Sequence, residues 1–280
     1  MPRGLPYIAR ILQGWSREAQ VKIEIRRGEY RDVECLRELY RAENPCQIWA
    51  DSALRRRLAE PYLLLLEGRL SGYGAVWTQI DPGRLTELYL LPFARQHALE
   101  IFRELLRASA ATEIAAQTNI PLLTMLLYDC ATHIGTEKIL FEDAFTSNLA
   151  AHGATFRPST QSDASETAEA PTQWIVEFGG NVVTKGGFLC HYNPPYGDIF
   201  MEVREGTRQR GFGSYLVQEL KRVCYEAGRI PVARCSPGNV ASRKTLQKAG
   251  LLPCARVLVG RVEGDHGGCS DATLGGLCRD

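Results

Sequence analysis

Two stretches of this chain repeat one order of expected elements: a β-hairpin, a strand, a helix, a strand and a helix. Alternating apolar residues predict the strands, and apolar residues three and four positions apart predict the helices. The segments are 62–77, 85–91, 98–109, 113–118 and 119–131 in the first stretch, and 174–192, 198–203, 213–228, 231–236 and 239–250 in the second. Strands that alternate with helices form a sheet covered by helices. We therefore predict an α/β chain of two similar mixed-sheet halves, related by an internal repeat.

A low-complexity segment separates the two stretches. Residues 159–172, STQSDASETAEAPT, are polar and contain no aliphatic side chain larger than alanine, which is typical of a linker. This segment predicts a first domain over 1–158, which begins with a helical arm, and a second domain over 173–262. The Gly-rich segment 263–280 is expected to be a flexible tail.

Charge and cysteine content exclude several classes of protein. The formal net charge is +1 over 280 residues, so no overall field attracts nucleic acid or an anionic membrane. No apolar run reaches the roughly 18 residues of a membrane span. The nine cysteines are scattered, and neither a CxxC pair nor a Cys/His cluster with zinc spacing occurs. We expect free thiols in a reducing compartment, the cytoplasm, and no metal.

One turn carries the clearest chemical signal. In TRQRGFG, residues 207–213, Gly211 and Gly213 come between a strand and a helix, and Arg208 and Arg210 precede the first glycine. The N-terminus of a helix has unpaired N–H groups and a positive dipole end, and glycines let an anion approach closely. The turn therefore predicts a phosphate site. It matches neither a P-loop nor a dinucleotide fingerprint, and a tight turn with solvated arginines is the alternative interpretation.

The second half resembles the GNAT superfamily of N-acetyltransferases. Their signature is Arg or Gln, two residues, Gly, one residue, and Gly or Ala, which Arg208 to Gly213 meets. Val203 ends the preceding strand as in the family, and the last helix begins at Asn239 as expected. The resemblance covers about residues 173–260. The first half, whose corresponding turn has no glycine, resembles a degenerate second copy, so the chain is similar to a tandem GNAT protein.

The resemblance implies that acetyl-CoA is the acyl donor and that the second half binds it. The pyrophosphate would lie on the backbone N–H groups of 209–214, and the pantetheine arm would pair with the backbone of 201–203. Asn239 would hold the arm, or serve only as a helix N-cap. The implied binding residues are Met201, Glu202, Val203, Arg208, Gln209, Arg210, Gly211, Phe212, Gly213, Ser214, Asn239 and Ser242.

Transfer to an amine requires a base, because the amine arrives protonated. Asp198 and Glu202 lie four residues apart on one strand and share a face if the strand is regular. Tyr196 could relay protons or stack on the substrate. These three residues are our catalytic candidates, and the alternatives are a solvated strand face and hairpin packing. Many family members have a tyrosine as acid where this chain has Leu246.

We therefore predict an N-acetyltransferase that moves acetyl to a small-molecule or peptide amine by direct attack in a ternary complex. A non-catalytic acyl-CoA sensor is the alternative, favoured by Leu246 and by the degenerate first half. Gly186 and Gly187 raise the further alternative of a longer acyl chain. The second half lacks the two helices that wall the acceptor site in the family, so we expect the first half to supply that wall.

Overall fold

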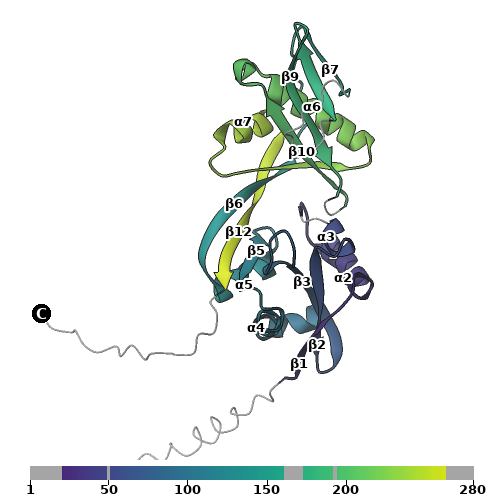
Figure 1. Cartoon of the computed structure of the whole chain (residues 1–280), viewed down its shortest axis with the longest axis vertical. Helices are drawn as coiled ribbons and strands as arrows, with labels where there is room; N and C mark the ends of the chain where they lie inside the picture. The colour runs from purple at the N-terminus through teal and green to yellow at the C-terminus, as the bar shows by residue number, and fades with distance from the viewer. Residues whose placement is uncertain (1–20, 49–50, 161–172, 192–193, 263–280) are drawn as a thin grey trace, which may run out of the picture.

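The computed structural model describes residues 21–48, 51–160, 173–191 and 194–262. The predicted N-terminal arm, residues 161–172 of the predicted linker and the predicted tail lie outside these residues, as do Tyr192 and Asn193. The described residues form one twelve-stranded sheet in the order β1-β2-β3-β4-β5-β12-β6-β11-β10-β9-β8-β7. Figure 1 shows two lobes along the long axis, joined by strands β6 and β12. This mixed α/β architecture confirms the predicted fold class. Among the described residues, no helix combines the length and apolar character needed to cross a bilayer.

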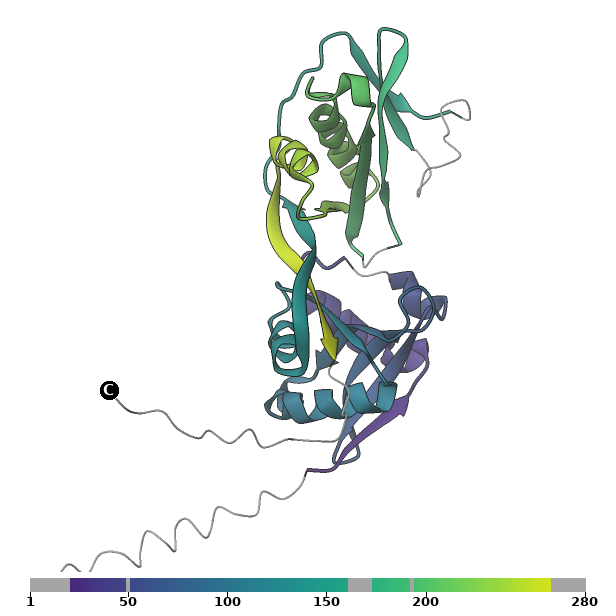
Figure 2. The ribbon, with the colours of Figure 1, turned by 60° about the vertical axis from the view of Figure 1, so that its left-hand side comes forward.

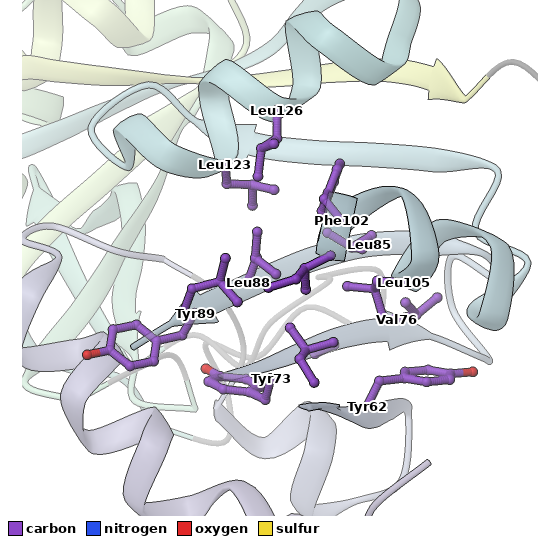
Figure 3. Close-up of a cluster of buried hydrophobic side chains, with 14 of the residues drawn as sticks. Tyr62, Tyr73, Val76, Leu85, Leu88, Tyr89, Phe102, Leu105, Leu123 and Leu126 are labelled. Carbon is purple, nitrogen blue, oxygen red and sulfur yellow. The ribbon is translucent and has the colours of Figure 1, made fainter. Parts of the chain in front are cut away.

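The first half has helices on both faces of its sheet. Tyr73 on β3 meets Tyr40 of α2 edge to face, with ring centroids 6.4 Å apart. The next residue, Gly74, faces α4, where an added Cβ would lie 2.5 Å from Leu105 Cδ2. Figure 3 shows the side chains of α4 and α5 pointing toward the strands. The elements are β1 (Ile23–Arg27), α2 (Tyr30–Glu43), α3 (Asp51–Arg55), β2 (Ala59–Leu66), β3 (Arg69–Trp77), β4 (Arg84–Leu90), the 3-10 helix η1 (Pro92–His97), α4 (Ala98–Ser109), β5 (Glu113–Gln117) and α5 (Pro121–Cys130).

The second half repeats this order without counterparts of α2 and α3 among the described residues. Its opening strand, β7, pairs antiparallel with β8 as β1 pairs with β2. Its helix α6 buries Leu216 and Leu220 against β9 and β10 because Gly186 leaves room: a Cβ there would lie 3.0 Å from Leu216 Cδ2. Gly179 and Gly180 turn the hairpin with φ values of 57° and 73°. The elements are β7 (Ala154–Pro158), β8 (Trp174–Phe178), β9 (Asn181–Leu189), β10 (Tyr196–Val203), the 3-10 helix η3 (Glu205–Thr207), α6 (Phe212–Glu226), β11 (Ile230–Cys235) and α7 (Val240–Lys248).

Two long strands exchange between the halves. After α5 the chain enters the second half as β6 (Ala131–Asp143), which pairs with β11. After α7 it returns as β12 (Leu251–Val262), which pairs with β5 of the first half. The two strands also pair with each other, and Figure 2 shows them side by side between the lobes. Each half is thus completed by a strand from the other. The domain limits 1–158 and 173–262 stay a prediction, and this exchange means that such units would be interlocked in space.

The sequence predictions missed β6, β7 and β12. In β12, Pro253 removes a backbone donor and a β-bulge breaks the alternation between Pro253 and Ala255. In β6 partly buried and exposed residues alternate from Thr132 to Lys138, but Ile134 is the only large apolar residue among them, so the sequence has little hydrophobic alternation there. Both strands therefore depend on pairing with distant segments more than on local pattern.

Candidate functional site

The turn between β10 and α6 has the backbone that its glycines permit. Gly211, the N-cap of α6, has φ 88°, a value that other residues rarely adopt. A Cβ at Gly213 would lie 3.0 Å from Val203 Cγ2 and 3.2 Å from Thr245 Cγ2, so this glycine lets α6 approach β10 and α7 closely. The first turn of α6 contains no acidic residue. The positive end of the helix dipole is therefore not opposed by a carboxylate of the helix's own first turn.

A cavity of about 950 Å³ opens at this turn. All of the predicted coenzyme-binding residues except Arg210 line it. Beyond this predicted set, the cavity is also lined by Thr207, Val240, Ala241, Lys244, Thr245 and Lys248. Lys248 Nζ lies 4.0 Å from where a Cβ of Gly211 would stand. Three cationic side chains, Arg208, Lys244 and Lys248, thus surround a helix N-terminus, which suits an anionic ligand.

Strand β10 provides an unpaired backbone edge beside the cavity. Its parallel pairing with β11 covers Tyr196 to Ile199, whereas its antiparallel pairing with β9 continues to Val203. Within the described residues, the edge of 200–203 on the β11 side therefore has no strand partner. Met201, Glu202 and Val203 from this segment line the cavity. A ligand with amide groups can pair with such an edge as an added strand does.

Helix α7 contributes its N-terminus and one face. Asn239 is the N-cap, and its Oδ1 accepts a hydrogen bond of 2.9 Å from the Ser242 N–H. The capping interpretation of Asn239 is thus confirmed, and its role toward a coenzyme stays a prediction. Lys244 and Lys248 are one helical turn apart and line the cavity, and this four-residue spacing was the signal available in the sequence.

Arg210 is not among the lining residues of the cavity. Its guanidinium lies over the rings of Phe178 and Phe212, at 4.9 and 5.2 Å from their centroids. This geometry is a cation–π contact that ties the turn to β8. The coenzyme-binding role predicted for Arg210 has no support from its position.

The catalytic candidates lie in two places. Glu202 is exposed and lines the cavity. Asp198 is buried, with 4% of its surface exposed, and its Oδ2 accepts a 3.0 Å hydrogen bond from Arg234 Nε on β11. Burial raises the pKa of Asp198 to about 6, although the Arg234 charge opposes the rise. Its other oxygen, Oδ1, has no hydrogen-bond partner among the described residues.

Tyr196 lies beside Asp198 where the first half contacts the second. Its hydroxyl oxygen accepts a 2.6 Å hydrogen bond from the backbone N–H of Cys46, which follows α2. Burial raises the pKa of Tyr196, so the phenol stays protonated at neutral pH. Cys46 and Ile48 pack in one apolar cluster with Val232 of β11. The first half therefore covers part of the second-half sheet face that carries Asp198.

Two further features bear on the alternatives. Leu246, which replaces the tyrosine of many GNAT enzymes, is 2% exposed and packs in the second-half core. Gly186 and Gly187 do not enlarge the site: added Cβ atoms would lie 2.5 Å from Phe200 O and 2.6 Å from Gln173 Oε1, respectively. These glycines serve close packing, and they give no support to a longer acyl chain.

The seven described cysteines carry free thiols. Cys46, Glu142 and Cys254 place ligand-type atoms within 4.8 Å of one another, although they are far apart in the sequence. No local spacing in the sequence indicates that these three residues meet.

Comparison with known proteins identifies the fold. The family described as FR47-like protein matches residues 191–252, which contain β10, the glycine turn, α6 and α7. A GNAT-family acetyltransferase from Colwellia psychrerythraea is similar in structure, with TM-score 0.70 and 16% identity over 86% of this chain and 100% of that one. A tandem GNAT protein from the clavulanic acid biosynthesis pathway has TM-score 0.54 and 11% identity over 87% and 99%. No curated protein sequence matches the chain.

These similarities define the class of protein. The chain has the fold of a tandem GNAT protein, and the resemblance to the GNAT superfamily inferred from the sequence is confirmed. A GCN5-related N-acetyltransferase from Sphaerobacter thermophilus, at TM-score 0.54 and 16% identity over 85% of this chain and 95% of that one, has the same fold.

Proposed function

We propose that this chain is an acyl-CoA-dependent N-acetyltransferase whose second half binds acetyl-CoA and whose first half does not. One observation carries the proposal: a single cavity joins the glycine turn at the N-terminus of α6 to the unpaired edge of β10. Acetyl-CoA has the matching parts, namely a pyrophosphate and an amide-containing arm that ends in a thioester.

The lining residues suggest how acetyl-CoA is held. The pyrophosphate lies on the N–H groups of 209–214, with Arg208 and Lys248 beside it. Lys244 is placed to meet a further phosphate. The pantetheine arm pairs with the backbone of 201–203, and Asn239 hydrogen-bonds to it. A backbone N–H near Val203 polarises the thioester carbonyl and stabilises the oxyanion that forms.

The chemistry is direct attack within a ternary complex. A base removes one proton from the ammonium of the acceptor, and the free amine attacks the thioester carbon. The C–S bond then breaks, and coenzyme A leaves as a thiolate that is protonated from the site or from water. Two carboxylates are candidates for the base. Glu202 lines the cavity, whereas Asp198 is buried near the junction between the halves. Tyr196 is a protonated phenol near Asp198 and can donate.

We place the acceptor, a small-molecule or peptide amine, between the halves. Support comes from the contact of Cys46 with Tyr196 and from the Coulombic influence of Arg56, beyond α3, on His191 beside β10. The first half thus takes the position at which a wall of the acceptor site is expected.

Gly211→Asp tests the assignment. The new carboxylate would point toward the cavity, where a Cβ has no neighbour closer than Lys248 Nζ at 4.0 Å, and it would repel the pyrophosphate. We expect acetyl-CoA to bind at least about 100-fold more weakly by calorimetric titration, as expected when a buried anion faces a like charge. Gly228→Asp is the matched control, since Gly228 also has positive φ, 70°, and an open Cβ position, but is not among the cavity-lining residues. Equal binding by both variants would contradict the proposal.

The acyl-CoA sensor remains the second candidate because Leu246 is buried where an acid is expected. Release of free thiol from acetyl-CoA, measured across a panel of primary amines, separates the two functions. An enzyme releases thiol with at least one amine and yields the acetylated product. A chain that binds acetyl-CoA in the Gly211-dependent manner but never turns it over is a sensor.

A further inference from the structure

Two cysteines from opposite ends of the chain meet at the junction of the halves. The Sγ atoms of Cys46 and Cys254 are 3.3 Å apart, although 208 positions separate them in the sequence. Cys46 belongs to the segment after α2, and Cys254 belongs to the exchanged strand β12. The pair therefore connects a first-half loop to the strand that pairs with both β5 and β6.

Irregular backbone at both positions directs the thiols toward each other. Cys46 has φ 48°, an uncommon value for a residue with a side chain. Cys254 is the extra residue of a β-bulge: Pro253 pairs with Phe141 and Ala255 with Leu140, and no partner on β6 remains for Cys254. A bulge reorients the side chain that it carries. The local backbone at both cysteines thus favours the close approach of the two sulfur atoms.

The two thiols differ in access and in ionisation. Cys46 is 2% exposed, and Cys254 is partly exposed. Hydrogen bonding with the Cys46 thiol lowers the pKa of Cys254, while the same contact and then burial raise the pKa of Cys46. A partly exposed thiol of lowered pKa next to a buried resolving thiol is the arrangement of redox-sensitive cysteine pairs.

We propose that Cys46 and Cys254 form a reversible disulfide by exchange with a low-molecular-weight disulfide such as glutathione disulfide. The Cys254 thiolate attacks one sulfur of the small disulfide, forms a mixed disulfide and releases one small thiolate. Cys46 then loses its proton to solvent, and its thiolate attacks Cys254 Sγ and expels the second small thiolate. In sum, two protein thiols are oxidised, one small disulfide is reduced to two thiols, and one S–S bond forms in the protein.

The disulfide would hold the Cys46 loop of the first half in place beside Tyr196, one of the catalytic candidates. The backbone N–H of Cys46 donates to the hydroxyl of Tyr196, so a bond from Cys46 to β12 holds the loop against β10. It also links the first half covalently to the strand exchanged between the halves. This proposal depends on the two thiols and not on the coenzyme cavity, so it holds whether or not the chain transfers acetyl groups.

The test uses the full chain equilibrated in glutathione buffers of increasing disulfide-to-thiol ratio, then acid-quenched, digested and analysed by mass spectrometry. We expect a peptide pair joined through Cys46 and Cys254 that disappears on reduction. Cys46→Ser and Cys254→Ser should each abolish it, and Cys35→Ser, which removes an exposed thiol of α2, should not. Glutathione retained at Cys254 without the internal bond, or no reaction at either thiol, overturns the proposal.

A second measurement keeps the test independent of digestion. Closing so long a loop constrains the unfolded chain, so oxidised protein should melt about 5 to 10 °C higher than reduced protein, and the shift should be absent from Cys254→Ser. The carboxylate of Glu142 is near both thiols, so the reduced chain is also titrated with Zn²⁺. Zinc binding that protects both thiols from alkylation and that Glu142→Gln removes would assign the pair to a metal site and overturn the disulfide.

Discussion

The turns that precede α4 and α6 occupy equivalent places in the two halves, but only the second is suited to an anion. Gly211, with φ 88°, corresponds to Ala98, which has φ −60° at the end of the 3-10 helix η1. Gly213 corresponds to Glu100, whose carboxylate lies in the first turn of α4. The two turns show that a few residues, rather than the fold, decide which helix N-terminus accepts a phosphate.

The corresponding arginines of the two turns also differ in whether they face a ligand cavity. Arg95, which corresponds to Arg208, donates to Glu43 Oε2 at 2.5 Å and to Leu90 O at 3.0 Å. Arg208 instead lines the cavity. Both halves, in contrast, have two parallel strands that separate after a few residues. In the first half β4 pairs with β5 only at Arg84 and Leu85, and in the second half β10 pairs with β11 only from Tyr196 to Ile199. Strand separation is thus a property of the fold, and it does not by itself indicate a coenzyme site.

The carboxylates on the corresponding sheet faces are also used differently. Glu87 on β4 accepts hydrogen bonds from Arg37 of α2, at 2.9 Å, and from the hydroxyl of Tyr73, at 2.8 Å. Both side chains of the Arg37–Glu87 pair are nearly inaccessible, at 0% and 4% exposure. In the second half no described helix takes the place of α2, and Arg234, the partner of Asp198, is 33% exposed. The first-half face is closed by a buried ion pair, and the second-half face retains access through its arginine.

Separating the halves should have the largest effect. A fragment beginning at residue 173 lacks β6, so β11 loses its neighbour and β12 loses both β5 and β6. We expect this fragment to show no acetyl-CoA binding and no cooperative unfolding. The measurements are calorimetric titration and circular dichroism melting of the fragment beside the full chain.

The matched control is the full chain cut at a protease site inserted between residues 161 and 172. Because β6 and β12 exchange, the two pieces should stay associated in size-exclusion chromatography and keep binding acetyl-CoA. A fragment that is folded and active alone would show that the halves are independent domains.

Breaking the buried ion pair of the first half should have the next largest effect. Arg37→Met leaves the Glu87 carboxylate buried without its cationic partner, which typically costs about 3 to 5 kcal/mol in the free energy of unfolding. Urea denaturation measures the loss. The double variant Arg37→Met with Glu87→Leu should recover most of it, because no unpaired charge remains. If the ion pair is purely structural, acetyl-CoA affinity of the folded protein is unchanged, and a large loss of affinity would point to a role of the first half in binding.

The buried Asp198 carboxylate should make the free energy of unfolding depend on pH. The pKa of Asp198 is raised from 3.8 to about 6 in the folded state, so the folded chain binds a proton that the unfolded chain has already lost between these values. The free energy of unfolding should therefore fall as pH rises from about 4 to about 6, by about 3 kcal/mol, and level off above. Asp198→Asn should remove this slope, as shown by urea denaturation across the pH range.

The same residues separate the candidate bases. If Asp198 is the base, turnover falls below about pH 6, and Arg234→Gln moves that limb to higher pH because it removes the charge that opposes the pKa rise. Glu202→Gln would leave the limb in place. The opposite pattern assigns the base to Glu202, the carboxylate at the cavity.

The sequence predicted the elements whose residues carry a local signal. The order of hairpins, strands and helices, the glycine turn and the Asn239 cap all depend on neighbouring residues, and each is present. The exchanged strands, the position of Arg210 over Phe178 and the approach of Cys46 to Cys254 depend on distant partners. The contact of the Cys46 loop with Tyr196, two residues before Asp198, is likewise one that no pattern around residue 198 reveals.

The smallest expected effect tests the charge at the second turn. Lys248 Nζ lies near the position of a Gly211 side chain, so Lys248→Gln removes one partly solvated cation from a phosphate site. Interactions of this kind contribute about 0.5 to 1 kcal/mol, so the dissociation constant for acetyl-CoA should rise about 2- to 5-fold. Arg95→Gln removes one charge from the equivalent first-half turn, where Glu43 already holds it, and should leave the affinity unchanged. The difference between the two variants should shrink as salt is raised, since screening weakens exposed charges. Equal changes in the dissociation constant would mean that acetyl-CoA binding depends on the overall charge of the protein and not on the charge at the Gly211 turn.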